Sequence, residues 1–243
     1  MVHGTLTGDA TPGGAHAHRV IWLVRHGEST WNVAGRAQGH CDQARLTRRG
    51  VHQAWGVVGR LGDRPIGALF ASDLHRAVAT AAPLGSVLGL DIVRDTRLRE
   101  RCLGDLEGSA TTAVTPAVSG ISENRVVDPE ARPPGGESLR DFYRRVAGFV
   151  ADLAEQRLPG LSAGGSLGLS PSLSPGLSPG LSAGFCPGPG EAKEIVIVAH
   201  GGTLRMLSAC LRGVPVERMA WEPLDNASIL RACAPALKLT TPR

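Results

Sequence analysis

The stretch VIWLVRHGESTWN, residues 20–32, decides the fold. It begins as an apolar run, which is typical of a strand buried on both faces of a sheet. The run ends abruptly in Arg25, His26 and Gly27. A charged arginine and a titratable histidine are costly at the end of a buried strand unless they serve a site there. Because ligands of open α/β sheets bind outside the carboxyl ends of the strands, we expect this strand to deliver Arg25 and His26 to a binding site.

A second stretch, EIVIVAHGG at residues 194–202, repeats this design. It predicts another buried strand, which ends in His200 and Gly201. One strand-ending His-Gly pair is a weak signal, because such a histidine is often an ordinary loop residue. Two pairs would meet at one sheet edge if their strands are parallel neighbours. The sequence therefore favours a common site that contains His26 and His200.

Strands alternate with helices along the rest of the chain, and residues 32–45 are expected to form a loop. Further strands are predicted over residues 66–71, 90–93 and 226–231. Helices are predicted over residues 46–62, 73–88, 138–153 and 203–212. This alternation predicts an α/β fold, namely a three-layer sandwich with a mostly parallel central sheet and helices on both faces.

The helix predicted over residues 73–88 carries Arg76 in its first turn, and Ser72 is expected to cap it. A helix N-terminus already attracts anions through its free N–H groups and its dipole. An arginine there gains nothing from the dipole, so Arg76 indicates an external anion at this position. The alternative, a solvated surface arginine, stays open.

The chain of 243 residues is long enough for one sizeable domain. Residues 1–18 are predicted to form a disordered leader, and residues 19–243 a single domain. Residues 158–190 contain a four-residue GLSP repeat and little bulk, so we expect a disordered Gly/Ser/Pro/Leu-rich insertion there. Residues 109–136 hold several prolines and no clear period. They are expected to cover the site, with a short helix among them.

Charge and cysteine usage exclude several classes of function. The net charge is +4, but the basic residues are spread along the chain and not interleaved with aromatic residues, which argues against a nucleic-acid partner. No signal peptide is evident, and no apolar run approaches the ~18 residues of a membrane span. The five cysteines are widely spaced and lack a Cys-x-x-Cys pair, which argues against disulfides and zinc. We expect a cytoplasmic protein without a metal or cofactor.

The polar residues at the predicted strand ends, in one predicted helix start and in a loop suit phosphate chemistry: Arg25, His26, Arg76, Glu100 and His200. The arginine fork matches the oxygens of a phosphate group. A histidine can attack phosphorus, and a carboxyl group can protonate the leaving alcohol. Glu100 has a simpler alternative, a loop carboxylate paired with Arg99 or Arg101.

Five short motifs occur in order along the chain: RHGE at 25–28, SDLHRA at 72–77, LRE at 98–100 with GDLEG at 104–108, GGES at 135–138, and AHGG at 199–202. Together they resemble the histidine phosphatase superfamily, and more narrowly its phosphoglycerate-mutase-like branch. The resemblance runs from about residue 19 to residue 231, with residues 158–190 outside it.

This resemblance implies roles for individual residues. His26 would be the nucleophile that becomes phosphohistidine, and Glu100 would be the proton donor. Arg25, Arg76 and His200 would also belong to the catalytic group. The phosphate would be bound by a set of polar and small residues: Arg25, Asn32, Gln38, Arg76, His200 and Gly201.

The resemblance also bears on the reaction. The bisphosphoglycerate-dependent mutases of the family carry a long basic segment, whereas residues 109–136 contain only Arg125 and Arg132 as bases. This favours a phosphatase acting on small phosphate esters, such as sugar phosphates or phosphoglycerate derivatives. Arg99 and Arg101 keep a mutase open, and a non-catalytic binding member of the fold is a further alternative. A homodimer is likewise left open.

Overall fold

The computed structural model describes residues 19–161 and 193–234. Its centre is a five-stranded sheet in the order β3-β2-β6-β1-β7. The bounds of these strands are β1 Arg19–Arg25, β2 Ile66–Ala71, β3 Ile92–Arg94, β6 Glu194–Ala199 and β7 Ile229–Ala234. Only β7 runs antiparallel, against β1. The sheet is thus mostly parallel, as the sequence predicts.

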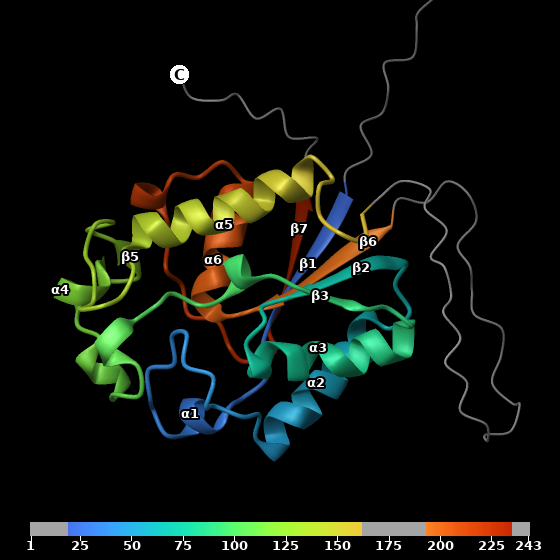
Figure 1. Ribbon diagram of the computed structural model, residues 1–243, viewed down its shortest axis with the longest axis horizontal. Coiled ribbons are helices and arrows are strands. Elements are labelled where there is room, and N and C mark those ends of the chain that lie inside the picture. The colour runs from blue at the N-terminus through green and yellow to red at the C-terminus, as the bar shows by residue number, and fades with distance from the viewer. Residues whose placement is uncertain (1–18, 162–192, 235–243) are drawn as a thin grey trace, which may run out of the picture.

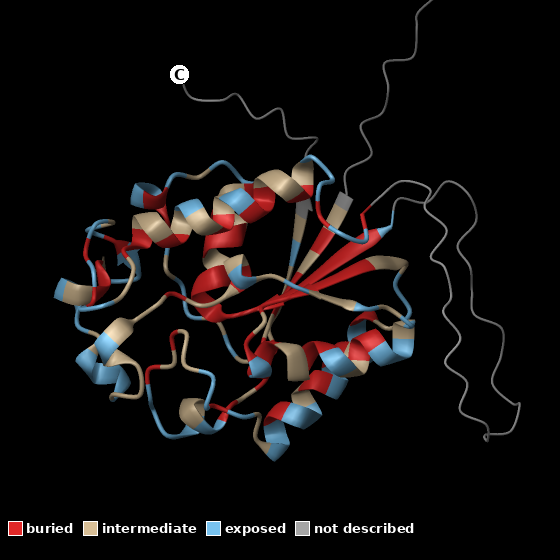
Figure 2. Ribbon diagram, viewed as in Figure 1, coloured by how far each residue is buried: buried red, intermediate tan, exposed pale blue. Residues whose placement is uncertain are grey.

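Helices cover both faces of the sheet (Figure 1). α2 (Arg48–Leu61) and α3 (His75–Leu88) lie on one face, and α5 (Leu139–Ala154) and α6 (Gly201–Leu211) on the other. The alternation of side chains along each strand explains the two cores. In β6, for example, Ile195 and Ile197 pack toward α5 and α6, whereas Val196 and Val198 pack toward α2 and α3. The predicted three-layer sandwich is confirmed, and its central strands are buried (Figure 2).

Side-chain caps fix the start of two of these helices, as expected. The Thr47 hydroxyl accepts from the backbone N–H of Gly50 at 3.0 Å at the start of α2. The Ser138 hydroxyl accepts from the N–H of Asp141 at 3.1 Å at the start of α5. Such a cap satisfies one of the N–H groups that a helix leaves free at its first turn.

Several predicted boundaries are wrong. α3 begins at His75 rather than at residue 73, and its N-cap is Leu74, without a side-chain hydrogen bond. Ser72 lies two residues before this N-cap; its hydroxyl accepts from the Leu74 N–H at 3.3 Å and lies 2.9 Å from Nε2 of His200. α6 begins at Gly201, two residues earlier than expected, and the last strand is shifted to β7. A short helix α1, Thr30–Val33, enters the predicted loop.

The segment 109–136 contains the expected short helix, α4 (Pro116–Ser119), and a small hairpin of β4 (Ile121–Ser122) and β5 (Arg125–Val126). The start of the predicted insertion needs correction, because Leu158 and Leu161 are buried in the core beside α5. Their burial places residues 158–161 in the folded domain. The rest of the insertion, residues 162–190, and the predicted leader lie outside the described residues. Among the described residues, no helix is long and apolar enough to cross a membrane.

Candidate active site

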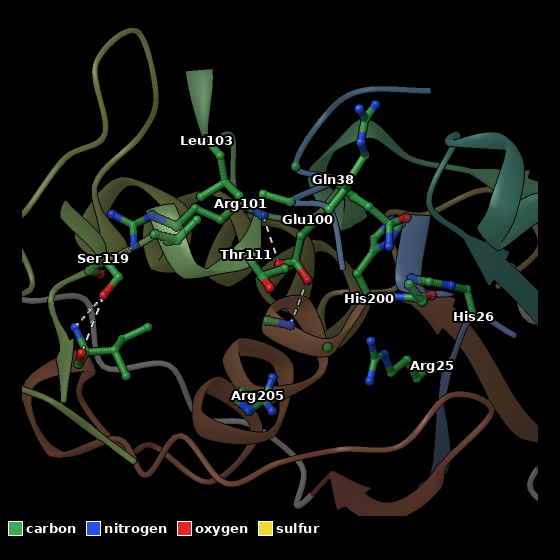
Figure 3. Close-up of a pocket in the computed structure, with 18 of the residues that line it drawn as sticks. Arg25, His26, Gln38, Glu100, Arg101, Leu103, Thr111, Ser119, His200 and Arg205 are labelled. Carbon is green, nitrogen blue, oxygen red and sulfur yellow. Dashed lines mark hydrogen bonds between the residues drawn. The ribbon is translucent and has the colours of Figure 1, made fainter. Parts of the chain in front are cut away.

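The two His-Gly turns meet because β1 and β6 are parallel neighbours. Their register pairs Arg25 with Ala199, so His26 and His200 follow at the same edge of the sheet. The backbone N–H of His26 donates to the Ala199 carbonyl at 2.9 Å. The two imidazole rings lie edge to face with their centroids 5.2 Å apart (Figure 3). The predicted meeting of the two histidines is confirmed.

The contacts of His26 define its chemical form. Its Nδ1 lies 2.8 Å from the Gly27 carbonyl oxygen. A carbonyl can only accept, so Nδ1 carries the proton and Nε2 presents a lone pair. Burial lowers the pKa of His26 well below its usual 6.5, and the charges of Arg76 and Arg25 lower it further. Nε2 of His26 is therefore an unprotonated, nucleophilic nitrogen at neutral pH.

Three buried nitrogen atoms without a hydrogen-bond partner surround this histidine. In the described part of the chain, four buried side-chain nitrogen or oxygen atoms lack a partner. Three of them are Nε of Arg25, Nε of Arg76 and Nδ1 of His200, and all three residues line one cavity. An unsatisfied buried polar group costs about 1–3 kcal/mol. A ligand rich in acceptor oxygens would satisfy these nitrogens together.

The protein holds other nitrogens of these side chains, and Arg25, for example, donates through Nη1 to the Leu224 carbonyl. Arg76 donates through Nη1 to the Cys41 carbonyl at 2.9 Å and through Nη2 to the Gly39 carbonyl at 2.8 Å. Nε2 of His200 lies 2.9 Å from the Ser72 hydroxyl. Arg76 and His200 are thereby fixed in place, and each keeps one nitrogen without a partner among the described residues. Such preorganised groups are what stabilises a developing negative charge.

Arg76 is wholly buried, so the alternative of a solvated surface arginine is wrong. Burial lowers its pKa to about 10, although Glu100 and Asp42 act in the opposite direction. Among the described residues, no carboxylate lies within ion-pair distance of it. A buried guanidinium without a counter-ion is costly. Its position supports the interpretation that Arg76 faces an external anion.

Glu100 reaches the same cavity from the loop that precedes residues 109–136, which we call the cover segment. Its Oε1 accepts from the Arg101 N–H at 2.9 Å, and its Oε2 accepts from the Gly202 N–H at 2.8 Å (Figure 3). Gly202 is needed here because a Cβ atom at this position would collide with Oε1 of Glu100. The carboxylate is thus oriented by backbone and keeps lone pairs free for a proton.

The simpler alternative for Glu100, an ion pair with a neighbouring arginine, is wrong. Arg99 instead pairs with Asp73, with N···O distances of 2.8 and 2.5 Å. The buried guanidinium of Arg101 donates to the carbonyls of Ser119 at 2.5 Å and Ala131 at 2.7 Å. Arg101 therefore fastens the cover segment to the loop that carries Glu100.

The cavity has a volume of about 320 Å³, and all the predicted site residues line it. These are Arg25, His26, Asn32, Gln38, Arg76, Glu100, His200 and Gly201. The amide oxygen of Asn32 accepts from the Ser29 N–H at 3.0 Å and from the side chain of Asn226 at 3.1 Å. The oxygen of Gln38 accepts from the Ser29 hydroxyl at 3.1 Å. With both oxygens occupied, these amides have their NH₂ groups left to donate to a ligand.

Sequence reasoning missed several residues on the outer part of the cavity: Arg36, Leu103, Thr111, Val114, Ser119, Ile121, Arg205 and Trp221. Those from residues 109–136 agree with the expectation that this segment covers the site. Arg205 follows Gly201 by one turn of α6, and this spacing could have revealed it. Trp221 lies in a segment without any pattern that points to the site.

The titration of His26 and His200 provides a prediction. Burial lowers the pKa of both, and Arg76 lowers both further. We expect two-dimensional NMR to show both rings still neutral at pH 6, with a histidine peptide in the same tube titrating near 6.5. At a pH between the lowered pKa of a folded-state histidine and its ordinary pKa in the unfolded chain, the unfolded chain binds more protons than the folded protein. The free energy of unfolding therefore falls as the pH drops through about 6.5. Protonation of either ring above pH 6.5 would contradict the described environment.

Comparisons with known proteins agree with this geometry. The family model of the histidine phosphatase superfamily, branch 1, matches residues 21–160 and 188–234. A glucosyl-3-phosphoglycerate phosphatase of Mycolicibacterium vanbaalenii is 32% identical over 199 residues, which are 82% of this chain and 76% of that protein. A probable phosphoglycerate mutase of Yersinia pestis is 32% identical over 212 residues, 87% of this chain and 83% of that protein.

Solved structures give the same picture. The structure of a mycobacterial glucosyl-3-phosphoglycerate phosphatase complexed with VO3 is similar, with a TM-score of 0.67 at 31% identity. The match covers 88% of this chain and 90% of that one. The α-ribazole phosphatase from Shigella flexneri is similar with a TM-score of 0.60 at 28% identity, covering 82% of each chain.

Proposed function

Since the chain belongs to the histidine phosphatase superfamily and is a histidine-dependent phosphatase, we propose that it hydrolyses small phosphorylated metabolites through a phosphohistidine formed on His26. One observation carries the proposal. The unprotonated Nε2 of His26 lies in a cavity with three buried nitrogens, on Arg25, Arg76 and His200, that have no partner within the described residues.

The proposed reaction has two steps. In the first, the lone pair on Nε2 of His26 forms a bond to phosphorus while the bond to the ester oxygen breaks. Glu100, in its protonated form, gives its proton to that oxygen, and the alcohol leaves. In the second, water attacks the phosphohistidine, Glu100 takes a proton from the water, and the P–N bond breaks to release phosphate.

The two surrounding arginines and the neutral ring of His200 supply the electrostatic part of the proposed catalysis. The transferring phosphoryl group spreads negative charge over three equatorial oxygens. Arg25, Arg76 and His200 can each direct one nitrogen at these oxygens, with Asn32 and Gln38 as further donors. Because protein contacts already fix these side chains, little reorganisation is needed when the charge develops.

The contacts of Arg99 and Arg101 favour hydrolysis over a mutase reaction. A mutase must hold a second phosphate group while the first is on the histidine. Arg99 and Arg101, which kept this alternative open, are engaged by Asp73 and by backbone carbonyls. A relative with a mutase name keeps the alternative worth testing, and 3-phosphoglycerate is the substrate that distinguishes the two.

The proposal includes a small phosphate ester as the partner and the cytoplasm as the location. The latter is supported by Cys41, Cys102 and Cys210, which are all free thiols in the structure, as in proteins of reducing compartments. A homodimer remains a prediction to be tested by the mass of the protein in solution.

Phosphate release from a panel of esters tests the function. The panel consists of p-nitrophenyl phosphate, glucose 6-phosphate and 3-phosphoglycerate, and 2-phosphoglycerate is assayed as a mutase product. We expect phosphate from the wild type. Glu100→Gln should slow the alkyl esters about 10²–10⁴-fold and the aryl ester far less, because an aryl oxide leaves without a proton. Equal slowing would contradict the acid role, and 2-phosphoglycerate without phosphate would indicate a mutase.

A further inference from the structure

The outer part of the cavity contains a cation that the proposed reaction does not use. Arg205 lines the cavity together with Trp221, Val114 and Ile121. In Figure 3, His26 lies toward one end of the pocket and Ser119 toward the other, with Glu100 and Arg205 between them. Because Glu100 protonates the leaving oxygen in the proposed reaction, this outer part receives the leaving alcohol.

The guanidinium of Arg205 is fixed in place from two sides. Its Nε donates to the Glu222 carbonyl at 2.7 Å, and its Nη2 donates to the same oxygen. The group also stacks on the Trp221 ring, 5.0 Å from the ring centroid. Trp221 in turn is held by the cover segment, because its N–H donates to the Asn124 carbonyl at 2.7 Å. Arg205 is thus a preorganised group rather than a free surface side chain.

The third nitrogen of this guanidinium, Nη1, has no hydrogen-bond partner within residues 19–161 and 193–234. It lies 3.1 Å from the point where a Cβ on Gly201 would be, and Nε of Arg25 lies 3.6 Å from the same point. The two arginines therefore flank Gly201, where α6 begins at the edge of the cavity. Arg25 lies at the end of the cavity beside His26, where the phosphate group binds in the proposed reaction. Arg205 therefore offers N–H donors next to this phosphate end.

The charge of Arg205 is not neutralised by a direct ion pair in the described part of the chain. In contrast, Arg97, Arg99 and Arg145 near Glu100 each pair with a carboxylate. Burial lowers the pKa of Arg205, the carboxylates of Glu100 and Glu222 act in the opposite direction without forming a direct ion pair, and Arg25 lowers it. A partly buried, unpaired guanidinium is stabilised by any anion that the cavity brings to it.

We propose that Arg205 binds a carboxylate on the leaving alcohol, so that the enzyme selects phosphate esters whose alcohol carries a second negative charge. This inference rests on the proposed function, because the role of Glu100 as proton donor decides that the leaving alcohol lies in the outer part of the cavity. The apolar side chains of Val114, Ile121 and Trp221 cover the carbon skeleton, and Arg205 contacts the charged end. Esters of neutral alcohols fit the cavity but leave Nη1 without its partner.

Two esters of equal size test the selection, since 3-phosphoglycerate has a carboxylate where glycerol 3-phosphate has a CH₂OH group. We expect the wild type to favour 3-phosphoglycerate in kcat/KM. Arg205→Gln should lower kcat/KM for 3-phosphoglycerate on the order of 10–100-fold, mostly through KM, as for a charged hydrogen bond. The loss for glycerol 3-phosphate should be at least about tenfold smaller. Arg205→Lys should recover part of the preference, because it keeps the charge.

The matched control is Arg212→Gln, which removes an exposed arginine at the end of α6 and outside the cavity. Its ratio of the two kcat/KM values should equal that of the wild type. Equal losses for both esters in Arg205→Gln would overturn the proposal and assign Arg205 to the phosphate end or to Glu100. A wild type without any preference would overturn it as well.

A binding measurement separates this inference from the proposed function. Calorimetry in a His26→Asn background gives dissociation constants for both esters without turnover, with and without Arg205→Gln. Weakening that is confined to 3-phosphoglycerate supports the carboxylate site, even if the wild type releases no phosphate from any ester. Equal affinities for the two esters in the His26→Asn background overturn the carboxylate site, even if the wild type is an active phosphatase.

Discussion

His26→Ala abolishes phosphate release from every ester that the wild type hydrolyses, with a loss on the order of 10⁴-fold or more. The reason is that the proposed reaction needs a nucleophilic lone pair at phosphorus, and His26 supplies it. Nδ1 of His26 is committed to the Gly27 carbonyl, so Nε2 is the nitrogen that can bond to phosphorus. The remaining donors can bind and polarise an ester, but they cannot accept the phosphoryl group.

The measurement is phosphate release together with a trap of the intermediate. Wild-type protein quenched during turnover should carry an acid-labile, alkali-stable phosphoryl group, which is absent from His26→Ala. His26→Asn serves as a second variant, because its amide can still donate to Gly27 and the turn is kept. His52→Ala, an exposed histidine of α2, is the control and should match the wild type. A phosphoryl group that persists without His26 would rule out the proposed nucleophile.

The strand-end residues were predictable because their signal is local. An apolar run that stops at a charged residue reveals both the strand and the edge at which it ends. This is why the sequence alone favours a common site for His26 and His200. The sequence does not show that β1 and β6 are neighbours, because strands far apart along the chain pair here, and only the structure supplies this pairing.

The partners of these residues were not predictable, because they come from distant segments. Serine is a favoured residue type at helix N-caps, yet the hydroxyl of Ser72 contacts His200, which lies 128 residues away in sequence. Local propensity predicts that Ser72 caps α3, but the helix begins at His75, and the propensity gives no sign of the contact with His200. The contact between Arg205 and Trp221 likewise depends on the cover segment that holds Trp221, and no periodic pattern marks that contact.

Arg76→Met should lower kcat/KM on the order of 10²–10³-fold, as expected for one lost donor to a developing charge. The substitution should change the stability of the ligand-free protein only slightly, because it has two opposing effects on that stability. The carbonyls of Gly39 and Cys41 lose their donors, which destabilises the variant. The variant also no longer buries a guanidinium that has no carboxylate partner among the described residues, which stabilises it.

The response of Tm to inorganic phosphate shows whether Arg76 binds an anion or serves only as a structural tie, that is, a side chain that connects α3 to residues 39–41 by hydrogen bonds. A ligand that binds only the folded state raises Tm according to its affinity. Phosphate should raise the Tm of the wild type and of Arg48→Met, an exposed arginine of α2, but not that of Arg76→Met. If Arg76 were only a tie between α3 and residues 39–41, its loss would lower Tm without phosphate and leave the phosphate-induced rise intact. The unpartnered Nε, wholly buried beside His26 and His200, favours the first outcome, since a structural tie would use that nitrogen as well.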